Sequence, residues 1–433
     1  PLEVKTVDLR FQSRHSNMLE DRVKLIYISD DCLDRTNLGK WPWSRSVHAR
    51  LLDQLASAGA KAVGFDVIFN DPSSNDQAGD EALVQAGKKF GRTVFPMFFS
   101  PAATLDPETS EFKIEKNLEK PFPSLQAAAA ELGLINVDFQ TDNTDGIVRR
   151  VSLVFEDGEK QYPSFALAIA QAALGTTWTY QNQRLSFGPR DIPLVWLPHL
   201  SREQKAWQFS RRPVFFVNYL GPAISGSFGS FNFSDIIAGR VDMSVFKDKI
   251  VLVGPSAVGL GDIKPTPFGN MPGVLIHANI VQNLLNGNFL SQTGPLVNII
   301  ILFVLSCTIF IFLSFLSPKW MATASIALLV SYHLVCLWLF LKADIILEVM
   351  VPSLLIVLQF TIGRFWRMVA TVKSTMDSLQ ERQLQLEKSN IALDCRVREL
   401  TLINEAGIKF PSILDLETLS FEVLSTFCRL WKA

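Results

Sequence analysis

The sequence predicts an α/β protein: a three-layer, largely parallel-sheet domain, followed by a three-helix transmembrane unit and a parallel coiled coil. Three observations support this prediction. Residues 1–290 alternate strand-like and helix-like segments, as parallel sheets covered by helices do. Three long apolar segments follow, and a seven-residue leucine pattern comes after them. With 433 residues, the chain has room for about two or three domains.

Composition excludes some classes of function and points to a membrane. The net charge is −1, from 41 basic and 42 acidic residues, so no basic field favours nucleic acid as a partner. The hydrophobic content of 48% is high for a soluble protein, and the excess lies in one region. Of the five cysteines only Cys32 lies in residues 1–290, and no Cys/His spacing is typical of zinc. We therefore expect no disulfide in that part, no metal and no cofactor.

The first elements follow from hydrophobic periodicity. Residues 24–30 have the composition of a strand, and residues 44–58 carry an apolar stripe at helical spacing. The members of this stripe are Val47, Leu51, Leu55 and Ala58. Residues 62–69 are apolar nearly throughout, which fits a parallel strand covered on both faces.

The alternation continues to residue 285. The remaining predicted helices are 80–90, 124–132, 164–174 and 273–285. The remaining predicted strands are 93–99, 134–137, 148–155, 215–219 and 250–253. Residues 176–212 and 221–246 are rich in aromatics, proline or glycine, and we expect irregular insertions there.

In "KIVLVGPSAVGLGD", residues 249–262, the last predicted strand runs directly into a glycine-rich loop. Its glycines, Gly254, Gly259 and Gly261, do not have the spacing of the dinucleotide fingerprint. Gly254 and Gly259 match the spacing of a nucleotide P-loop, but Leu260 and Gly261 stand where Lys and Ser or Thr are needed. We therefore expect a tight connection from strand to loop, because glycine readily adopts positive φ.

Acidic residues follow three of the predicted strands. In open parallel sheets, ligands bind outside the carboxyl ends of the strands. The acids there, with a nearby Arg and His, could frame a polar pocket for a cation or an amine, or for acid–base chemistry. The candidate ligand-binding residues are Asp30, Asp31, Arg45, His48, Asp66, Gly254, Gly259, Gly261 and Asp262.

The alternative is structural: Asp66 and Arg45 are then buried partners that organise loops, since charge clusters indicate a site only statistically. No nucleophile elbow, zinc-peptidase, kinase or cyclase signature occurs in the sequence, so we predict no catalytic residue.

Three apolar segments are long enough to cross a hydrocarbon core of about 30 Å. They are residues 296–316, 320–341 and 345–363. The first two are so close in sequence that they predict an antiparallel hairpin. The third contains Glu348 near its start, where it can reach interfacial water, and Pro352, which membrane helices tolerate.

An odd number of spans places the two soluble parts on opposite sides of the bilayer. Arg364, Arg367 and Lys373 follow the third span, whereas residues 276–295 contain no Lys or Arg. The positive-inside rule therefore predicts a cytoplasmic C-terminus and extracytoplasmic residues 1–290 in a multi-pass inner-membrane protein. This topology requires a translocating helix upstream of Pro1.

A heptad pattern over residues 373–400 predicts a coiled coil. The a positions are Met376, Gln383, Asn390 and Val397, and the d positions are Leu379, Leu386, Leu393 and Leu400. Leucine at d with Asn at a favours two parallel strands and hence a homodimer. The alternative is a single amphipathic helix packed on its own domain.

Several segments within residues 1–290 resemble a known family. They are "LGKWPWSRSVHARLLDQLASAGAKAVGFDVIF", "DNTDGIVRRVSL", "PSFALAIAQ", "VNYLGP" and "KIVLVGPSAVGLGDIKPTPFGNMPGVLIHANIVQNLL". In this order they look like the CHASE-type extracellular sensor, second type, of cyclases and histidine kinases. Three membrane helices after the domain are also typical of that family. The resemblance implies a sensory input role and transfers no catalytic residue. Residues 401–433 in turn resemble the start of a GAF domain.

Together these features predict the sensory and transmembrane part of a bacterial signal-transduction receptor. An extracytoplasmic ligand or protein would be detected, and a cytoplasmic effector beyond Ala433 would respond. A histidine kinase of a two-component system is the first expectation, and a diguanylate or adenylate cyclase is the second. We expect no enzymatic activity in residues 1–433. The alternatives are a scaffold or accessory subunit of a membrane complex, and a membrane-tethered extracytoplasmic enzyme that depends on Asp30, Asp66 or Asp262.

Overall fold

The computed structural model describes residues 2–14, 21–34, 38–39, 41–105, 112–136, 145–203, 206–222, 228–260, 262–409 and 415–432. The chain forms two compact units. The first consists of Pro1–Phe303 and Leu328–Ser353, and the second of Val304–Ala327 and Leu354–Ala433.

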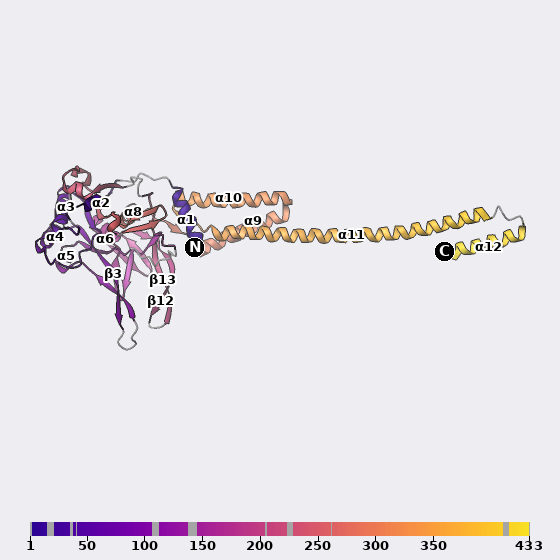
Figure 1. Ribbon diagram of the computed structural model, residues 1–433, viewed down its shortest axis with the longest axis horizontal. Helices are drawn as coiled ribbons and strands as arrows, with labels where there is room; N and C mark the ends of the chain where they lie inside the picture. The colour runs from indigo at the N-terminus through magenta and orange to yellow at the C-terminus, as the bar shows by residue number, and fades with distance from the viewer. Residues whose placement is uncertain are drawn as a thin grey trace. The chain divides into compact units, whose positions relative to one another are not determined.

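The first unit is built on a sheet that has seven strands in the described part of the chain, in the order β14-β1-β15-β2-β3-β4, with β5 also paired to β3 (Figure 1). The strands are β1 (Val23–Ile28), β2 (Ala62–Phe65), β3 (Thr93–Leu105), β4 (Phe112–Glu119), β5 (Glu131–Leu134), β14 (Gly229–Asn232) and β15 (Ile250–Pro255). Neighbouring strands are parallel, and only β3 and β4 pair antiparallel. The predicted α/β class with a largely parallel sheet is confirmed.

Strand β15 lies between β1 and β2, and its side chains alternate between two hydrophobic clusters. Ile250 and Leu252 join residues of α6 (Phe165–Leu174) and α8 (Gly273–Asn286). Val251 and Val253 join residues of α3 (Arg45–Ser57) and α4 (Gln77–Phe90). A strand that is apolar on both sides therefore has a separate core on each, as its continuous apolar sequence predicts.

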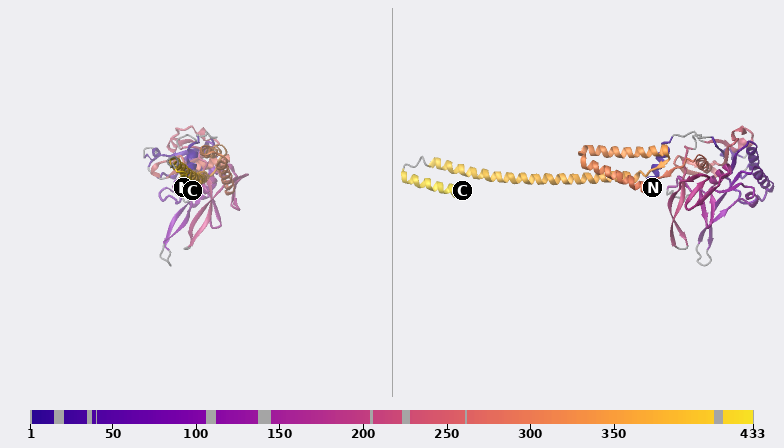
Figure 2. Two further views of the ribbon diagram at one scale, coloured as in Figure 1. Left: turned by 90° about the vertical axis from the view of Figure 1, so that its right-hand side faces the viewer. Right: turned by 180° about the vertical axis from the view of Figure 1, so that it is seen from behind.

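The region predicted to be irregular, residues 176–212, contains strands, so that prediction is wrong. It forms β9 (Trp178–Gln181), β10 (Arg184–Phe187), β11 (Arg190–Ile192), β12 (Val195–Glu203) and most of β13 (Ala206–Phe216). Asn182 and Gln183 join β9 to β10 with φ of 50° and 65°, the backbone of a two-residue hairpin turn. The strands between such turns are short and polar, so the sequence has no long apolar run here that would predict them. The β3–β4 and β12–β13 hairpins extend from the same side of this unit (Figures 1 and 2).

Other predicted boundaries also change. The helix predicted at 124–132 is a single turn, α5 (Pro123–Gln126), because β5 begins at Glu131 beside β3. The strand predicted at 148–155 is divided into β6 (Arg150–Val151) and β7 (Val154–Asp157), and β7 pairs with β8 (Lys160–Pro163). The segment 221–246 contains β14, α7 (Phe233–Ile237) and the 3-10 turn Met243–Phe246. The shorter elements are α1 (Leu2–Gln12), α2 (Asp30–Leu33), β16 (Ile263–Thr266) and β17 (Gly269–Pro272).

Three helices of the described chain are long and apolar enough to cross a membrane. They are α9 (Pro295–Phe315), α10 (Pro318–Ala343) and the N-terminal part of α11 (Met350–Lys409). The third begins at Met350 and not at the predicted Ile345. Ile345 and Ile346 instead form β19, which pairs with β18 (Ser291–Gln292) within the first unit, so their backbone is used in strand pairing and the helix begins after them.

Within the second unit, α9 and α11 pack closely. Gln359 Nε2 donates to Ser306 Oγ at 2.9 Å, and Arg367 Nη1 donates to the Leu316 carbonyl at 2.8 Å. Between these contacts, a Cβ at Gly363 would collide with Leu313. A small residue flanked by hydrogen bonds is typical of helix contacts in membranes. This unit ends with α12 (Leu416–Lys432).

Candidate functional site

Asp66 and Asp262 come together at the carboxyl ends of β2 and β15. The Asp66 N–H donates to the Val253 carbonyl at 2.7 Å, and the Asp66 side chain is buried, with the residue 8% exposed. Gly254 makes this approach possible, because a Cβ there would lie 3.0 Å from the Asp66 Cβ and 2.7 Å from Val274. Close packing thus explains Gly254, whereas the positive φ expected from the sequence is found at neither Gly254 nor Gly259.

The start of α8 surrounds Asp262 in the same way. The Gly273 N–H donates to the Asp262 carbonyl at 3.0 Å, and a side chain at Gly273 would collide with the Asp262 carboxylate. Lys264 Nζ lies 3.4 Å from Asp262 Oδ1. The carboxylate is therefore placed between a helix N-terminus and a lysine, both of which favour its charged form.

Asp66 is the less compensated of the two acids. Burial, and secondly the charge of Asp262, raise the pKa of Asp66 to about 8, although Lys264 opposes the rise. Burial also raises the pKa of Asp262, and Lys264 again opposes it. Asp66 Oδ2 has no hydrogen-bond partner among the residues that the structure describes. At neutral pH the pair therefore retains a proton on Asp66.

Among the described residues, no three His, Cys, Asp or Glu side chains gather to hold an ion. The arrangement can exchange a proton, and it holds two carboxyls near one ammonium group. Binding of an amine or cation by Asp66 and Asp262 stays a prediction.

Arg45 and His48 lie elsewhere. Arg45 forms an ion pair with Asp80, donates to the Asp71 carbonyl, and lies 5.0 Å from the Phe122 ring centre. Arg45 is half-buried and holds the loop around Asp71 against α4. The structural alternative named Asp66 and Arg45 together, but the Arg45 guanidinium bonds to Asp80 and Asp71.

His48 is enclosed by aromatic rings, with Phe69 and Phe233 both at 5.4 Å. Burial, and secondly Arg45, lower the pKa of His48 to about 3. His48 also faces Phe65, and successive residues of a strand point to opposite faces. The structure therefore does not bring His48 together with Asp66, the residue that follows Phe65.

Three further predicted residues, Asp30, Asp31 and Gly259, lie on α2 and in the 3-10 turn after β15. Asp30 and Asp31 are exposed in the first turn of α2. Gly259 lies in the 3-10 turn Val258–Leu260, with open space where a side chain would be. Gly261 lies outside the described residues.

A second charged cluster was not predicted from the sequence. Arg149 is 1% exposed and binds Asp8 of α1 through two hydrogen bonds of 2.6 Å. It also donates to both carboxylate oxygens of Asp145, at 3.0 and 2.8 Å. These hydrogen bonds lower the pKa of Asp145 to about 2. Because Asp8 and Arg149 are 141 residues apart, spacing gives no signal of this contact.

A third polar cluster holds the loop between α10 and α11. Asp344 Oδ1 accepts from Arg14 Nη2 at 2.6 Å and from Asn218 Nδ2 at 3.2 Å. Asn218 also exchanges two hydrogen bonds with Asn283 of α8, at 2.9 and 3.0 Å. The Arg14 guanidinium lies 4.5 Å from the Phe340 ring centre. The loop is thus tied to the body of the first unit by side chains as well as by β18 and β19.

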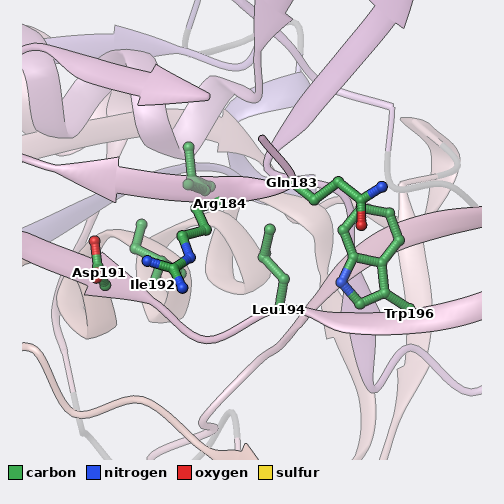
Figure 3. Close-up of a pocket in the computed structure, with 7 residues that line it drawn as sticks. Gln183, Arg184, Asp191, Ile192, Leu194 and Trp196 are labelled. Carbon is green, nitrogen blue, oxygen red and sulfur yellow. The ribbon is translucent and has the colours of Figure 1, made fainter. Parts of the chain in front are cut away.

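A shallow pocket of about 240 Å³ lies on the small β9–β11 sheet (Figure 3). Figure 3 shows Arg184 and Asp191 toward one side of it and Gln183 and Trp196 toward the other. Leu185, Ile192 and Leu194 complete the lining. Asp191 also accepts a hydrogen bond from Ser186 at 2.6 Å. None of the predicted site residues lines this pocket.

Comparison with known proteins gives one family. The family model described as CHASE2 domain matches residues 1–316. No curated protein and no solved structure matches the chain. The match covers well over half of the 433 residues and includes α9, the first of the three apolar helices. The chain therefore belongs to the CHASE2 domain family.

Proposed function

We propose that this chain is the sensory and membrane-spanning part of a bacterial signal-transduction receptor. One observation carries the proposal: an extracellular sensor domain, CHASE2, is followed by three helices that can cross a membrane. In this function the CHASE2 domain detects an extracytoplasmic ligand or protein. The stimulus changes the domain, and the helices carry the change across the bilayer.

The charges near α11 support an orientation in the inner membrane. Arg364, Arg367 and Lys373 follow the apolar part of α11, and their side of the membrane is the cytoplasm under the positive-inside rule. Residues 1–290 are then extracytoplasmic, and α12 with any following effector is cytoplasmic. The resemblance of residues 401–433 to a GAF domain favours a histidine kinase as effector, followed by a nucleotide cyclase.

The output helix is proposed to act as a parallel dimer. Leu379, Leu386, Leu393 and Leu400 are 56%, 64%, 64% and 62% exposed on α11 of a single chain. Leucines repeated at every seventh residue favour burial against a second copy, and Asn390 at an a position favours two strands in register. Two sensory domains would thereby control one pair of effectors.

Oxidative cross-linking in native membranes distinguishes the paired helix from the two alternative functions. Neither a membrane-tethered enzyme nor a scaffold requires α11 to pair with a second copy. The variant Leu386→Cys is compared with Lys388→Cys, in a chain whose exposed Cys307, Cys395 and Cys428 are changed to serine. Leu386 occupies d and Lys388 occupies f, on the far side of the helix. We expect most Leu386→Cys chains and few Lys388→Cys chains to form a disulfide-linked dimer. Equal yields for both, or no dimer for either, would exclude the paired helix.

A further inference from the structure

A carboxylate from the start of the chain caps the first turn of α11. Glu3 Oε1 and Oε2 each accept a hydrogen bond from the Val349 N–H at 3.0 Å. Oε2 accepts another from the Met350 N–H at 2.8 Å. The first amides of a helix lack partners within the helix, and the helix dipole favours a negative charge there. Glu3 therefore acts as an N-terminal cap for α11 across 346 residues of sequence.

Neighbouring side chains on α1 orient this carboxylate. Arg10 Nη2 donates to Glu3 Oε1 at 3.3 Å, and Thr6 Oγ1 donates to the same oxygen at 3.2 Å. Arg10 is itself buried. Glu3 is thus held against α11 by its own helix, and a change in the position of α1 must move the cap.

The same helix is fixed to the CHASE2 domain by a second carboxylate. Asp8 receives the two 2.6 Å hydrogen bonds from the buried Arg149. Residues five apart on an α-helix differ by about 140° around its axis, so Glu3 and Asp8 occupy different faces of α1. One face of α1 therefore contacts the domain through Asp8, and another contacts α11 through Glu3.

The loop before α11 has few degrees of freedom. Its first residue, Asp344, is bound by Arg14 and Asn218, and its carbonyl accepts from the Ser291 N–H at 2.9 Å. Five residues after Asp344, Glu3 binds the backbone at Val349. From Met350 onward α11 is one continuous helix to Lys409, so a rigid displacement of its first turn is carried along the helix.

We propose that α1 couples the CHASE2 domain to α11. It follows movements of the domain through the Asp8–Arg149 ion pair, and it fixes the position of the first turn of α11 through the Glu3 cap. Glu3 is then a positioning residue for α11. The inference rests on the proposed receptor function for its purpose, but the coupling itself is a property of the folded chain.

Hydrogen–deuterium exchange of the full chain in lipid nanodiscs tests the cap. The variant Glu3→Gln removes the charge and keeps the size, and Lys5→Gln is the control because Lys5 is exposed on the same helix. Loss of a cap is expected to speed exchange of the Val349 and Met350 amides roughly fivefold or more. Exchange in β15 should not change. Unchanged exchange at both amides in Glu3→Gln would overturn the cap.

The coupling is tested with Asp8→Asn, which touches neither amide. We expect Asp8→Asn to speed exchange at Val349 and Met350, and to add little when combined with Glu3→Gln, because both changes break one route. An effect of Asp8→Asn confined to residues around Arg149, or effects that multiply in the double variant, would overturn the coupling.

If Asp8→Asn also speeds exchange in β15, the domain itself has loosened. The milder variant Asp8→Glu, which keeps the charge and moves the carboxylate away from its position against Arg149, then replaces it with the same two expected results. Exchange does not depend on signalling. Coupling without a paired α11 would contradict the proposed receptor function and leave the coupling intact. A paired α11 without the coupling would overturn the coupling and leave the receptor function intact.

Discussion

Two pairs of carboxylates in the first unit have opposite surroundings. Asp8 and Asp145 share Arg149, which is 1% exposed and donates two hydrogen bonds to each of them. Asp66 and Asp262 have Lys264 on the side of Asp262, with Nζ 3.4 Å from Asp262 Oδ1. In the described part of the chain, Asp66 Oδ2 has no hydrogen-bond partner.

The difference shows in the protonation of the two pairs. The pKa of Asp145 falls to about 2, chiefly through the hydrogen bonds from Arg149. The pKa of Asp66 rises to about 8, chiefly through burial. Because the Arg149 guanidinium lies between Asp8 and Asp145, the first pair forms an ion-pair cluster that holds α1 on the domain. The second pair, with less compensation, holds a proton at neutral pH. The burial of Asp66 and the placement of the cation, and not the presence of two acids, decide which behaviour results.

The largest expected effect comes from removing the shared cation. Arg149→Met removes the guanidinium that Asp8 and Asp145 share, while Asp145 keeps the hydrogen bond from the Ile147 N–H. Breaking a buried ion pair costs about 3–5 kcal/mol of unfolding free energy, and we expect a loss near the lower end because the Asp8 and Asp145 side chains are 13% and 27% exposed. Amide exchange of β15, whose protection reports global opening of the domain, measures the loss.

The matched control is Arg240→Gln. Arg240 pairs with Asp235 at the surface, where both side chains are substantially exposed. A change of at most about 1 kcal/mol is expected there. If Arg149→Met cost no more than Arg240→Gln, the buried pair would not fasten α1.

A smaller effect, with a distinct pH dependence, is expected at Asp66. In the folded chain Asp66 stays protonated up to about pH 8, whereas in the unfolded chain it ionises above its ordinary pKa of 3.8. Stability from this group is complete below pH 3.8 and is lost as the pH rises toward 8, by at most about 1.4 kcal/mol per pH unit. Asp66→Asn should remove this slope, as measured by the β15 exchange between pH 5 and about pH 8.

Asp145 supplies the opposite sign as a control. Its lowered pKa means that its stabilisation is complete above pH 3.8 and is lost as the pH falls toward 2. Asp145→Asn should therefore change the acid limb and leave the slope between pH 5 and about pH 8 as it is. A wild-type profile that is flat across this range, or the same slope in Asp66→Asn, would show that Asp66 is ionised in the folded chain.

Much of the fold could be predicted because its longest elements have strong periodic patterns. The apolar stripe of α3, the uniformly apolar β15 and the closing helix α8 were predicted within a few residues. Strands β9–β11 were missed because each has only three or four residues and depends on turns such as Asn182–Gln183. The start of α11 was misplaced because the pairing of β19 with β18 is a tertiary contact that local apolar content does not reveal.

The polar clusters could be predicted only in part. Asp66 and Asp262 were expected at one sheet edge because parallel strands end together. His48 was expected with them, but the alternation of Phe65 and Asp66 puts it on the other face. The contacts of Asp8 with Arg149 and of Glu3 with Val349 join residues 141 and 346 positions apart. No spacing rule relates such residues, so only the folded chain shows them.

The central claim is that the bilayer separates the CHASE2 domain from the exposed part of α11. Labelling of cysteines with a membrane-impermeant maleimide tests it directly, because Cys395 and Cys428 are exposed whereas Cys32 is buried. We predict no labelling of Cys395 or Cys428 in intact spheroplasts and full labelling after permeabilisation, while a Lys89→Cys variant in the exposed surface of α4 reacts in intact spheroplasts. Labelling of Cys395 in intact spheroplasts, or of Lys89→Cys only after permeabilisation, would contradict the account.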